Sequence, residues 1–372
     1  MLMALSFVSA ILWLTLLCVP WRPWSVSQQL ERVDQSTPCL AHITALIPAR
    51  DEAECIAETI LAVASQGSLG GIVVIDDQSM DETASVVKNL NIKNLELVEG
   101  QTPPPGWTGK LWALEQGRKK ISTPYLLLLD ADIRLAPHAL TNLSQLQQKN
   151  NLDLVSVMAL LPIVNLWEKL LLPAFIFFFK LIYPFALSNN PNSKIAGAAG
   201  GCILIKASKL DDIGGFAALY DAIIDDCTLA KLVKKTGGRT WIGLSHDVEA
   251  IRPYDTLSNI WNMVARTAFT QLQYSLPLLL LSSGLLVITF LVPLAGTLSD
   301  NSNVQLLSAI SLIAMCITYL PTIRHYRCSP FWVFSLPFAS SLFLAMTWTS
   351  AIRYWQGERT RWKNRTYRKL DQ

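Results

Sequence analysis

Charged side chains are scarce in this sequence, and their scarcity narrows the class of protein. Asp, Glu, Lys and Arg make up 16% of the 372 residues, whereas 51% of the residues are hydrophobic. Soluble domains usually carry about 25% charged residues. The composition therefore predicts one globular domain combined with membrane segments, rather than a wholly soluble protein.

Paired cysteines and metal-binding spacings of histidine are also missing. The seven cysteines are odd in number and include no Cys-x-x-Cys pair. This pattern argues against a disulfide framework or a zinc site, and it fits a reducing compartment. The four histidines show no metal-ligand spacing, so we interpret all of them as structural.

No motif for reading nucleic acid accompanies the basic end of the chain. The net charge is only +3, but residues 353–372 contain seven Lys or Arg against one Glu and one Asp. We therefore expect no nucleic-acid partner. Such a tail is typical of a cytoplasmic juxtamembrane segment near anionic lipid or a polyanionic ligand.

The apolar amino-terminal segment lacks the positive charge that precedes the hydrophobic stretch of a secretory signal. Residues 1–21 are almost wholly apolar, and the first charged residue is Arg22. A basic flank after the helix predicts an uncleaved transmembrane anchor with its amino end outside. The chain that follows is then cytoplasmic.

Three further apolar segments, at 276–295, 304–320 and 331–352, approach or exceed the ~30 Å of membrane hydrocarbon. The loop at 297–303 has no Lys or Arg, which predicts that it lies outside. A third full span would then place the basic tail outside, against the positive-inside rule. We therefore expect a re-entrant or interfacial third segment.

Between the anchor and these segments, short apolar runs alternate with amphipathic stretches of about a dozen residues, which predicts an α/β domain with a doubly wound parallel sheet. Runs without alternation are typical of strands buried on both faces. The predicted strands are 42–48, 71–75, 95–98, 125–129, 153–159, 202–206 and 239–244. The predicted helices are 54–65, 82–90, 108–119, one from Pro137 at its first position to 148, and one opened by Asp225.

Residues 162–187 interrupt this alternation. They are apolar but contain Glu168, Lys169, Lys180 and three prolines. A charge at the bilayer centre costs roughly 2.5–3.5 kcal/mol, so a clean span is not expected. We predict short helices lying in the membrane interface, with Lys180 reaching the headgroups; a buried helical hairpin is the alternative.

These segments give the predicted organisation of the chain. It is a transmembrane anchor at 1–21, a cytoplasmic domain at 40–265 with interfacial helices at about 162–187, membrane segments at 275–352 and a basic cytoplasmic tail at 353–372. The predicted location is the inner membrane of a cell, with several segments in the bilayer.

Two carboxylates follow the predicted strand at 125–129. Asp130 and Asp132 are two residues apart, which places them on the same side of an extended backbone. Paired oxygens at the carboxyl end of a strand suit Mg²⁺ or Mn²⁺, which usually share their ligands with a substrate diphosphate. We predict Asp132 as the metal ligand, assisted by Asp130. A simple strand end with a solvated Asp130 is the alternative.

Four motifs together resemble the family 2 glycosyltransferases of the GT-A fold. They are Ile47-Pro-Ala-Arg-Asp-Glu52, Val74-Ile-Asp-Asp-Gln-Ser79, Leu129-Asp-Ala-Asp132, and Ile224-Asp-Asp226 after Gly214-Gly-Phe216. Gly106-Trp-Thr-Gly-Lys110 and Met263-Val-Ala-Arg-Thr-Ala268 make the chain similar to the membrane-bound, hopene-associated branch. Ceramide glucosyltransferases share the plan more loosely.

The resemblance implies an inverting, metal-dependent hexosyltransferase that moves a sugar from a nucleotide-sugar donor to a membrane lipid, of hopanoid type in that branch. Asp226 would be the general base, and Asp225 would raise its proton affinity by like-charge repulsion. The predicted contacts to the nucleotide sugar are Pro48, Arg50, Glu52, Asp76, Asp77, Lys110, Asp130 and Arg266.

One motif of this family is incomplete. Members that build long polymers carry Gln/Arg-x-x-Arg-Trp before their membrane helices, and here only Arg266 matches it. Processive synthesis is therefore not expected. A polysaccharide synthase, a nucleotidyltransferase of similar fold and a non-catalytic membrane scaffold stay open as alternatives. The nucleotidyltransferase should show a Gly-rich first loop, and the scaffold predicts neither donor hydrolysis nor metal dependence.

Overall fold

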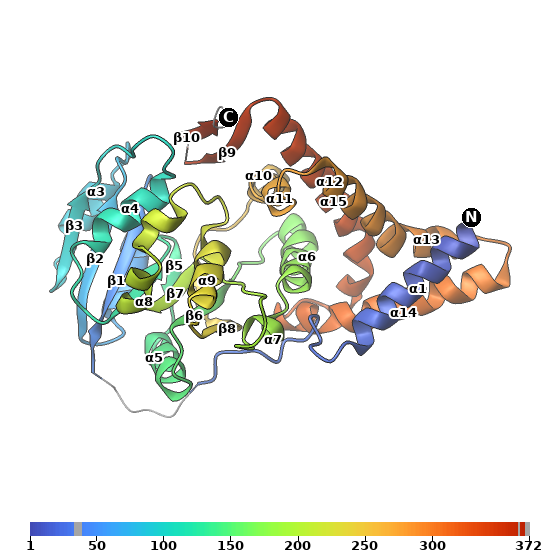
Figure 1. Cartoon of the computed structure of the whole chain (residues 1–372), viewed down its shortest axis with the longest axis horizontal. Helices are drawn as coiled ribbons and strands as arrows, with labels where there is room; N and C mark the ends of the chain where they lie inside the picture. Colours follow the sequence, from blue (N-terminus) through green and yellow to red (C-terminus); the bar gives the residue numbers. More distant parts are fainter. Residues whose placement is uncertain (33–38, 364, 369–372) are drawn as a thin grey trace. The chain divides into compact units, whose positions relative to one another are not determined.

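The computed structural model describes residues 1–32, 39–363 and 365–368 (Figure 1). The chain divides into two compact units, each of which is assembled from separate stretches of sequence. The sheet unit comprises Gln28–Pro162 and Leu187–Pro253. The helical unit comprises Met1–Ser27, Ile163–Ala186 and Tyr254–Gln372.

An eight-stranded sheet with the order β3-β2-β1-β4-β7-β6-β8-β5 forms the centre of the sheet unit. Its strands are β1 (Leu40–Ala49), β2 (Leu69–Asp76), β3 (Leu95–Glu99), β4 (Tyr125–Leu129), β5 (Ile133–Leu135), β6 (Leu154–Leu160), β7 (Cys202–Lys206) and β8 (Thr240–Ala250). The predicted strands are confirmed, and β5 is additional.

The prediction of a wholly parallel sheet is wrong. β7 runs antiparallel to β4 and β6, and β5 runs antiparallel to β8. A parallel neighbour needs a crossover of a dozen or more residues. Only Asp130–Asp132 separate β4 from β5, which is too short for a crossover. The segment between β6 and β7 is long, but it is not a regular crossover helix. The sheet is therefore mixed.

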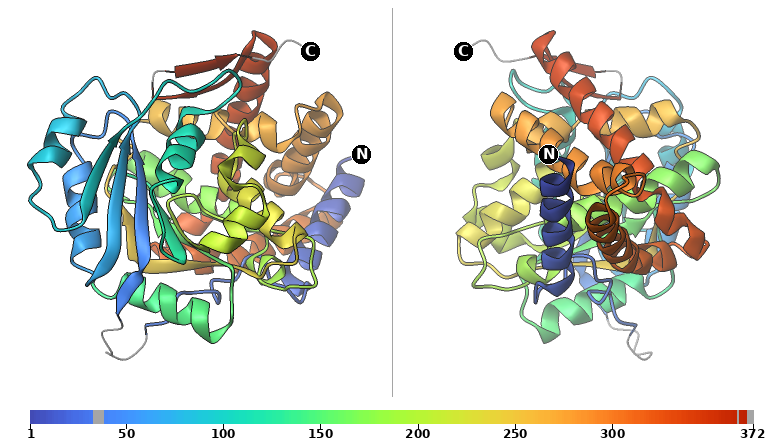
Figure 2. Two further views of the ribbon diagram at one scale, coloured as in Figure 1. Left: turned by 60° about the vertical axis from the view of Figure 1, so that its left-hand side comes forward. Right: turned by 90° about the vertical axis from the view of Figure 1, so that its right-hand side faces the viewer.

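Helices cover both faces of this sheet (Figure 2). One hydrophobic core includes residues of α2, α3 and α5, and a second core includes residues of α4, α8 and α9. The helices are α2 (Ile56–Ala64), α3 (Thr83–Asn89), α4 (Gly109–Arg118), α5 (Ala139–Lys149), α8 (Ala207–Asp212) and α9 (Asp225–Lys235), with a 3-10 turn η1 at Gly215–Leu219. The doubly wound prediction is thus confirmed for the layers.

Helix α5 begins later than predicted. Its N-cap is His138 in the left-handed conformation, so Pro137 precedes the helix instead of occupying its first position. Helix α9 begins at Asp225 as predicted, with Ile224 as its N-cap.

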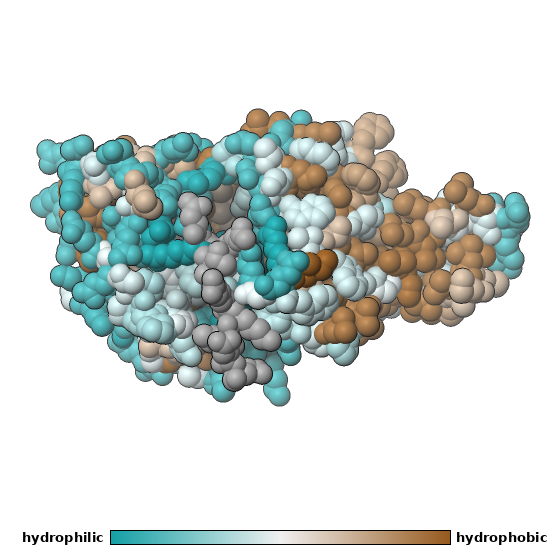
Figure 3. All heavy atoms as spheres, turned by 90° about the horizontal axis from the view of Figure 1, so that it is seen from above, coloured by the Kyte–Doolittle hydropathy of each residue, from teal (hydrophilic) through white to brown (hydrophobic). Residues whose placement is uncertain are grey.

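The helical unit contains three helical segments that are long and apolar enough to cross a membrane: Leu276–Gly296, Ser302–His325 and Pro330–Trp355. Many large hydrophobic side chains of this unit are exposed, and Figure 3 shows hydrophobic residues gathered over its helices. The elements are α1 (Leu2–Cys18), α6 (Leu166–Ile182), α7 (Phe185–Ser188, which continues into the sheet unit), α10 (Leu257–Ala265), α11 (Ala268–Gln271), α12 (Leu276–Leu286), η2 (Val287–Leu291), α13 (Val292–Gly296), α14 (Ser302–His325), η3 (Pro330–Ser335), α15 (Leu336–Trp355), β9 (Glu358–Trp362) and β10 (Arg365–Arg368).

The third apolar segment does not fold back on itself. η3 leads directly into α15, and together they form a continuous helical segment of 26 residues. A re-entrant segment needs a reversal in its middle, so the re-entrant form of the prediction is wrong. The interfacial form of the prediction, in which the segment lies along the bilayer, stays a prediction. The segment predicted as the amino-terminal anchor forms an apolar helix of 17 residues, α1, and its role as an anchor stays a prediction.

Residues 166–182 form the single helix α6 instead of several short helices. A capping box of Asn165 and Glu168 begins it, and Pro173 lies inside it. Lys180 does not reach outward as predicted. Its side chain is buried, and its ammonium group donates hydrogen bonds to the carbonyls of Trp24 and Ser25 and to the hydroxyl of Thr322. Partners distant in sequence thus satisfy this charge, and the interfacial position of α6 stays a prediction.

Candidate active site

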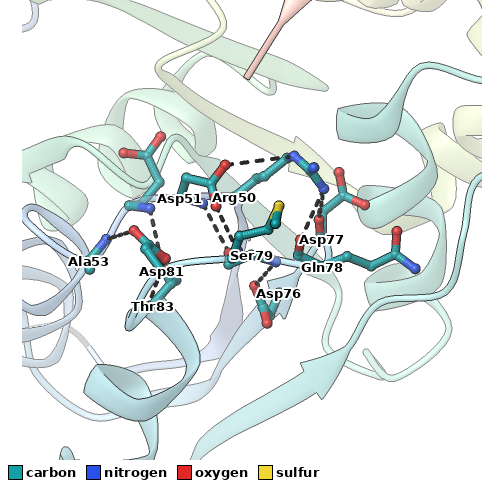
Figure 4. Close-up of polar contacts among 11 residues, drawn as sticks. Arg50, Asp51, Ala53, Asp76, Asp77, Gln78, Ser79, Asp81 and Thr83 are labelled. Atoms are coloured by element: carbon teal, nitrogen blue, oxygen red, sulfur yellow. Dashed lines mark hydrogen bonds and ion pairs between the residues drawn. The ribbon is translucent and has the colours of Figure 1, made fainter. Parts of the chain in front are cut away.

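The loops that follow β1 and β2 are held together by hydrogen bonds between their backbones and side chains (Figure 4). The Asp77 N–H donates to the Ala49 carbonyl at 2.8 Å, and the Asp51 N–H donates to the Ser79 hydroxyl at 3.0 Å. In return, the Asp51 carboxylate accepts from the Met80 N–H at 2.8 Å. The two strand ends therefore form one rigid ledge, which we call the β1–β2 ledge (residues 49–53 and 76–83).

Arg50 fastens this ledge further. Its side chain is buried, and its guanidinium donates to the carbonyls of Asp77 at 2.5 Å and Gln78 at 3.1 Å. Gln78 has a φ of 57°, which costs conformational energy in a non-glycine residue. Hydrogen bonds on both sides of this residue offset that cost.

The two predicted carboxylates of the ledge are also buried. Asp76 accepts a hydrogen bond from the Ser79 N–H at 3.1 Å, and the Asp77 side chain is fully buried. The structure therefore places Arg50, Asp76 and Asp77 together, as the sequence predicted. Their contacts to a nucleotide stay a prediction.

Lys110 lies at the centre of a second group of predicted residues. Its Nζ is 2.8 Å from Asp130 Oδ1 and 3.6 Å from Asp225 Oδ2. A Cβ atom built on Gly200 would lie 3.4 Å from both Lys110 Nζ and Asp226 Oδ2. The first turns of α4 and α9, the end of β4 and the backbone at Gly200 thus meet at one point. We call Lys110, Asp130, Asp225 and Asp226 the lysine–carboxylate cluster.

The cluster lines a pocket in the sheet unit together with Pro48. The other side chains of this pocket are mainly apolar, among them Leu114, Leu129, Phe216 and Leu219. Apolar walls lower the local dielectric and strengthen the interactions among the charges. Pro48 therefore lies beside the cluster.

Burial and neighbouring charges shift the proton affinities of the cluster. Burial acts to lower the pKa of Lys110, but the charges of Asp130 and Asp225 outweigh it and raise that pKa above its usual value. Burial raises the pKa of Asp130, against the charge of Lys110. Lys110 is therefore a permanent cation in this site.

The two acids at the start of α9 are not equivalent. Burial, followed by the charge of Asp225, raises the pKa of Asp226 to about 7. The Cys227 N–H donates to Asp226 Oδ1 at 2.7 Å and opposes this rise, as an N–H at a helix start does. Asp225 instead faces Lys110. Repulsion by Asp225 thus acts in the expected direction, and burial is the larger cause.

Asp130 and Asp132 lie in the short turn between β4 and β5. The Asp130 N–H donates to the Gly201 carbonyl at 3.1 Å, and the Asp132 carbonyl accepts from the Ile251 N–H at 2.7 Å. In the described part of the chain, no group of three or more His, Cys, Asp or Glu side chains could hold a metal ion. Two carboxylates fit a divalent cation that completes its shell with substrate oxygens and water. The pair is therefore compatible with Mg²⁺ or Mn²⁺.

Arg252 is a charged residue of this region that the sequence did not predict. Its guanidinium forms an ion pair with Glu52, whose side chain is buried. Asp132 lies close enough to raise the pKa of Arg252, although burial acts in the opposite direction. The predicted strand at 239–244 ends well before Arg252, whereas β8 continues to Ala250. A sequence prediction that extended this strand to Ala250 would have indicated that Arg252 follows a strand end.

Arg266 does not belong to this group. It lies in the helical unit directly after α10, where its carbonyl accepts a hydrogen bond from the Thr360 hydroxyl at 3.4 Å. All other predicted site residues lie in the sheet unit. The role predicted for Arg266 in diphosphate binding stays a prediction.

Comparisons with known proteins agree with this fold. Residues 44–214 match the family model described as "Glycosyl transferase family 2". The 4,4'-diaponeurosporenoate glycosyltransferase of Staphylococcus aureus (strain MRSA252) is 31% identical over 114 residues, a stretch that spans only 30% of this chain and 30% of that protein. Among solved structures, the mannosyltransferase PcManGT from Pyrobaculum calidifontis, in complex with GDP-Man and Mn2+, has a TM-score of 0.58 at 18% identity and covers 95% of this chain and 98% of its own. This likeness shows a shared fold.

Proposed function

We propose, on the premise that residues 44–214 form a Glycosyl transferase family 2 domain of the GT-A fold, that this protein moves a sugar from a nucleotide-sugar donor to a membrane lipid. The observation that carries the proposal is the lysine–carboxylate cluster beside the Asp130–Asp132 turn. Together these residues provide the Lys110 cation, two carboxylates of the kind that bind divalent metal ions, and Asp226, whose pKa is raised to about 7.

The donor would lie across the β1–β2 ledge and the cluster. Asp132 and Asp130 would hold Mg²⁺ or Mn²⁺, which when bound acts as a Lewis acid toward the diphosphate. PcManGT was solved with GDP-Man and Mn2+, which supports a divalent cation here. Lys110 would bind phosphate oxygens, and the ledge would accept hydrogen bonds from the nucleoside.

Asp226 would act as the general base. As the acceptor oxygen attacks the anomeric carbon, Asp226 takes the proton of that hydroxyl, and the bond to the diphosphate breaks on the opposite face of the sugar. A pKa near 7 suits a base at neutral pH. Asp225, which Lys110 holds, would keep the pKa of Asp226 high without reacting itself.

A lipid acceptor is supported by two observations. Three helical segments are apolar enough to cross a membrane, and the curated relative is a diaponeurosporenoate glycosyltransferase. Diaponeurosporenoate is named for that relative and is not assigned to this chain. This chain resembles the hopene-associated branch. We therefore propose an apolar lipid of hopanoid type as the acceptor, and a catalytic unit on the cytoplasmic side of a cell's inner membrane.

The test is a transfer assay on membranes that contain the full chain. Membranes are incubated with Mg²⁺ or Mn²⁺ and a panel of labelled sugar nucleotides, and the lipid extract is separated and analysed by mass spectrometry. We expect label in one lipid with one donor, and none with Asp226→Asn. Absence of both transfer and donor hydrolysis across the panel would favour the membrane scaffold.

A further inference from the structure

We infer that Arg252 is a second cation for the diphosphate of the donor, and that Glu52 orients its guanidinium for this contact. The inference rests on the proposed function, because the diphosphate is part of a nucleotide sugar. It adds to the cluster a residue that follows β8 in the chain and that none of the four sequence motifs contains.

The backbone fixes Arg252 next to the Asp130–Asp132 turn. The Ile251 N–H donates to the Asp132 carbonyl at 2.7 Å, and β5 and β8 pair immediately before this point. Arg252 thus follows directly the residue that is bonded to Asp132. From there its side chain reaches the end of β1, where Nη2 pairs with the Glu52 carboxylate and lies 4.0 Å from Cys55 Sγ.

Among the described residues, most of the hydrogen-bond donors of this guanidinium have no partner. A guanidinium carries five N–H groups. Within residues 1–32, 39–363 and 365–368, only Nη2 of Arg252 has one, while Nε is buried without a hydrogen bond. A buried charged donor without an acceptor is costly, and such a group in a native protein calls for an explanation. A phosphate oxygen is the acceptor that a guanidinium fork fits best.

The balance of charge also requires a second cation. Five carboxylates belong to the residues that pair with, or lie near, Lys110 and Arg252, namely those of Glu52, Asp130, Asp132, Asp225 and Asp226. Lys110 faces Asp130 and Asp225, whereas Arg252 faces Glu52 and lies near Asp132. The two cations thus pair with different carboxylates, and a diphosphate has two negative phosphoryl groups, one for each cation. The Arg252 side chain is 39% exposed, so a ligand can reach it.

A purely structural role for Arg252 makes a different prediction. An ion pair that only holds β8 against the end of β1 would change stability when it is removed, but not the affinity for phosphate. Arg134 offers a matched control, because it pairs with Glu58 and Glu249 in the same unit and is 51% exposed. It has no place in the proposed site.

The experiment measures binding of inorganic pyrophosphate, with Mg²⁺ present, to the purified full-length protein by calorimetry. We expect Arg252→Met to weaken this binding about 10- to 100-fold, the usual value of one charge-assisted hydrogen bond. Arg252→Lys should lie between Met and wild type, because lysine keeps the charge but loses the fork. Arg134→Met should bind as the wild type does.

The outcomes separate this inference from the proposed function. Wild-type affinity in both Arg252 variants, in protein that binds pyrophosphate, overturns the inference and leaves the function standing. Failure of the wild type to bind pyrophosphate, GDP and UDP overturns the function, and the inference with it. If Arg252→Met does not fold, Arg252→Lys decides: weakened binding at an unchanged melting temperature supports the inference, and unchanged binding overturns it.

Discussion

The β1–β2 ledge and the lysine–carboxylate cluster stand at neighbouring strand ends, yet they are stabilised in opposite ways. In the ledge, residues 49–53 and 76–83 donate hydrogen bonds to one another, and Arg50 donates mainly to the carbonyls of Asp77 and Gln78. In the cluster, Asp130 and Asp225 share one lysine, and burial raises the pKa values of Asp130 and Asp226. The backbone of the ledge is thus held in place by the ledge's own hydrogen bonds, whereas the cluster has an excess of negative charge that a divalent cation can relieve.

This difference predicts that mutations in the cluster and mutations in the ledge should affect different properties of the protein. Changes in the cluster should alter turnover and metal dependence, because its charges interact directly with reacting groups. Changes in the ledge should alter stability and donor affinity, because its bonds hold backbone in place. The four predictions below test this separation, from the largest expected effect to the smallest.

Asp132→Asn should have the largest effect, because it removes the charge that we assign to the metal. We expect transfer to fall at least about 100-fold, since a bound metal supplies several kcal/mol of charge stabilisation. Excess chelator should have a comparable effect on the wild type. The measurement is transfer rate against Mg²⁺ or Mn²⁺ concentration, with Asp153→Asn, paired with Lys206 elsewhere in the unit, as the control. Full activity in chelator would contradict the assignment.

Asp226→Asn should separate chemistry from binding. Turnover should fall about 10²- to 10⁴-fold, the usual share of a general base, while the donor dissociation constant changes little. Asp225→Asn should cost less, because Asp225 acts through the pKa of Asp226. Single-turnover rates and equilibrium donor binding give the two quantities separately. A larger loss of turnover in Asp225→Asn would move the base to the neighbouring residue.

The contrast also explains what the sequence could reveal about the fold. Buried strands such as β2 and β4 appear as unbroken apolar runs, so their positions were predicted correctly. The direction of β7 depends on the path that the chain takes before it, which no local pattern records. The same holds for Lys180, whose acceptors at Trp24 and Ser25 lie more than 150 residues away in sequence.

For the site, local motifs indicated the candidate residues where acidic residues stand at the end of a strand or the start of a helix. Asp76, Asp130, Asp225 and Asp226 follow or begin regular elements, and the structure places all four in the sheet unit as expected. Arg252 was missed because Ser245-His-Asp247 interrupts the apolar run of β8. Asp247 is nevertheless buried in the strand, where Arg32 compensates its charge. In the sequence alone, a charged residue such as Asp247 inside a strand cannot be told from the charged residues of a loop.

Arg50→Met tests the ledge. It removes the bonds to the carbonyls of Asp77 and Gln78 and leaves the buried Asp77 carbonyl without this donor, so we expect a loss of about 1–3 kcal/mol in the free energy of unfolding. Donor affinity should fall with it, while turnover at saturating donor stays within a few-fold. Lys88→Met, at an exposed pair with Glu99, is the control and should change stability by less than about 0.5 kcal/mol. Loss of turnover with unchanged stability would mean that Arg50 acts on the reacting groups.

The smallest expected effect concerns the pH dependence of the proposed base. Asp226 must be deprotonated to accept a proton, so kcat/KM, which reports the free enzyme, should fall as the pH drops through about 7. The charge of Asp225 is the second cause of that raised pKa, after burial. Removing the charge with Asp225→Asn therefore lowers the pKa of Asp226, and the acidic limb should move to lower pH by up to about one unit.

Burial of Asp226 persists in that variant, so the limb should not reach the pKa of an exposed aspartate. The ledge predicts the opposite for its own acids: Asp51→Asn should leave the position of the limb unchanged, because Asp51 is not among the main groups that shift the pKa of Asp226. The measurement is kcat/KM from pH 5 to 9 for the wild type and both variants, at a fixed metal concentration. A limb that Asp51→Asn moves as far as Asp225→Asn does would mean that the ledge and the cluster titrate as one group, and the contrast between them would fail.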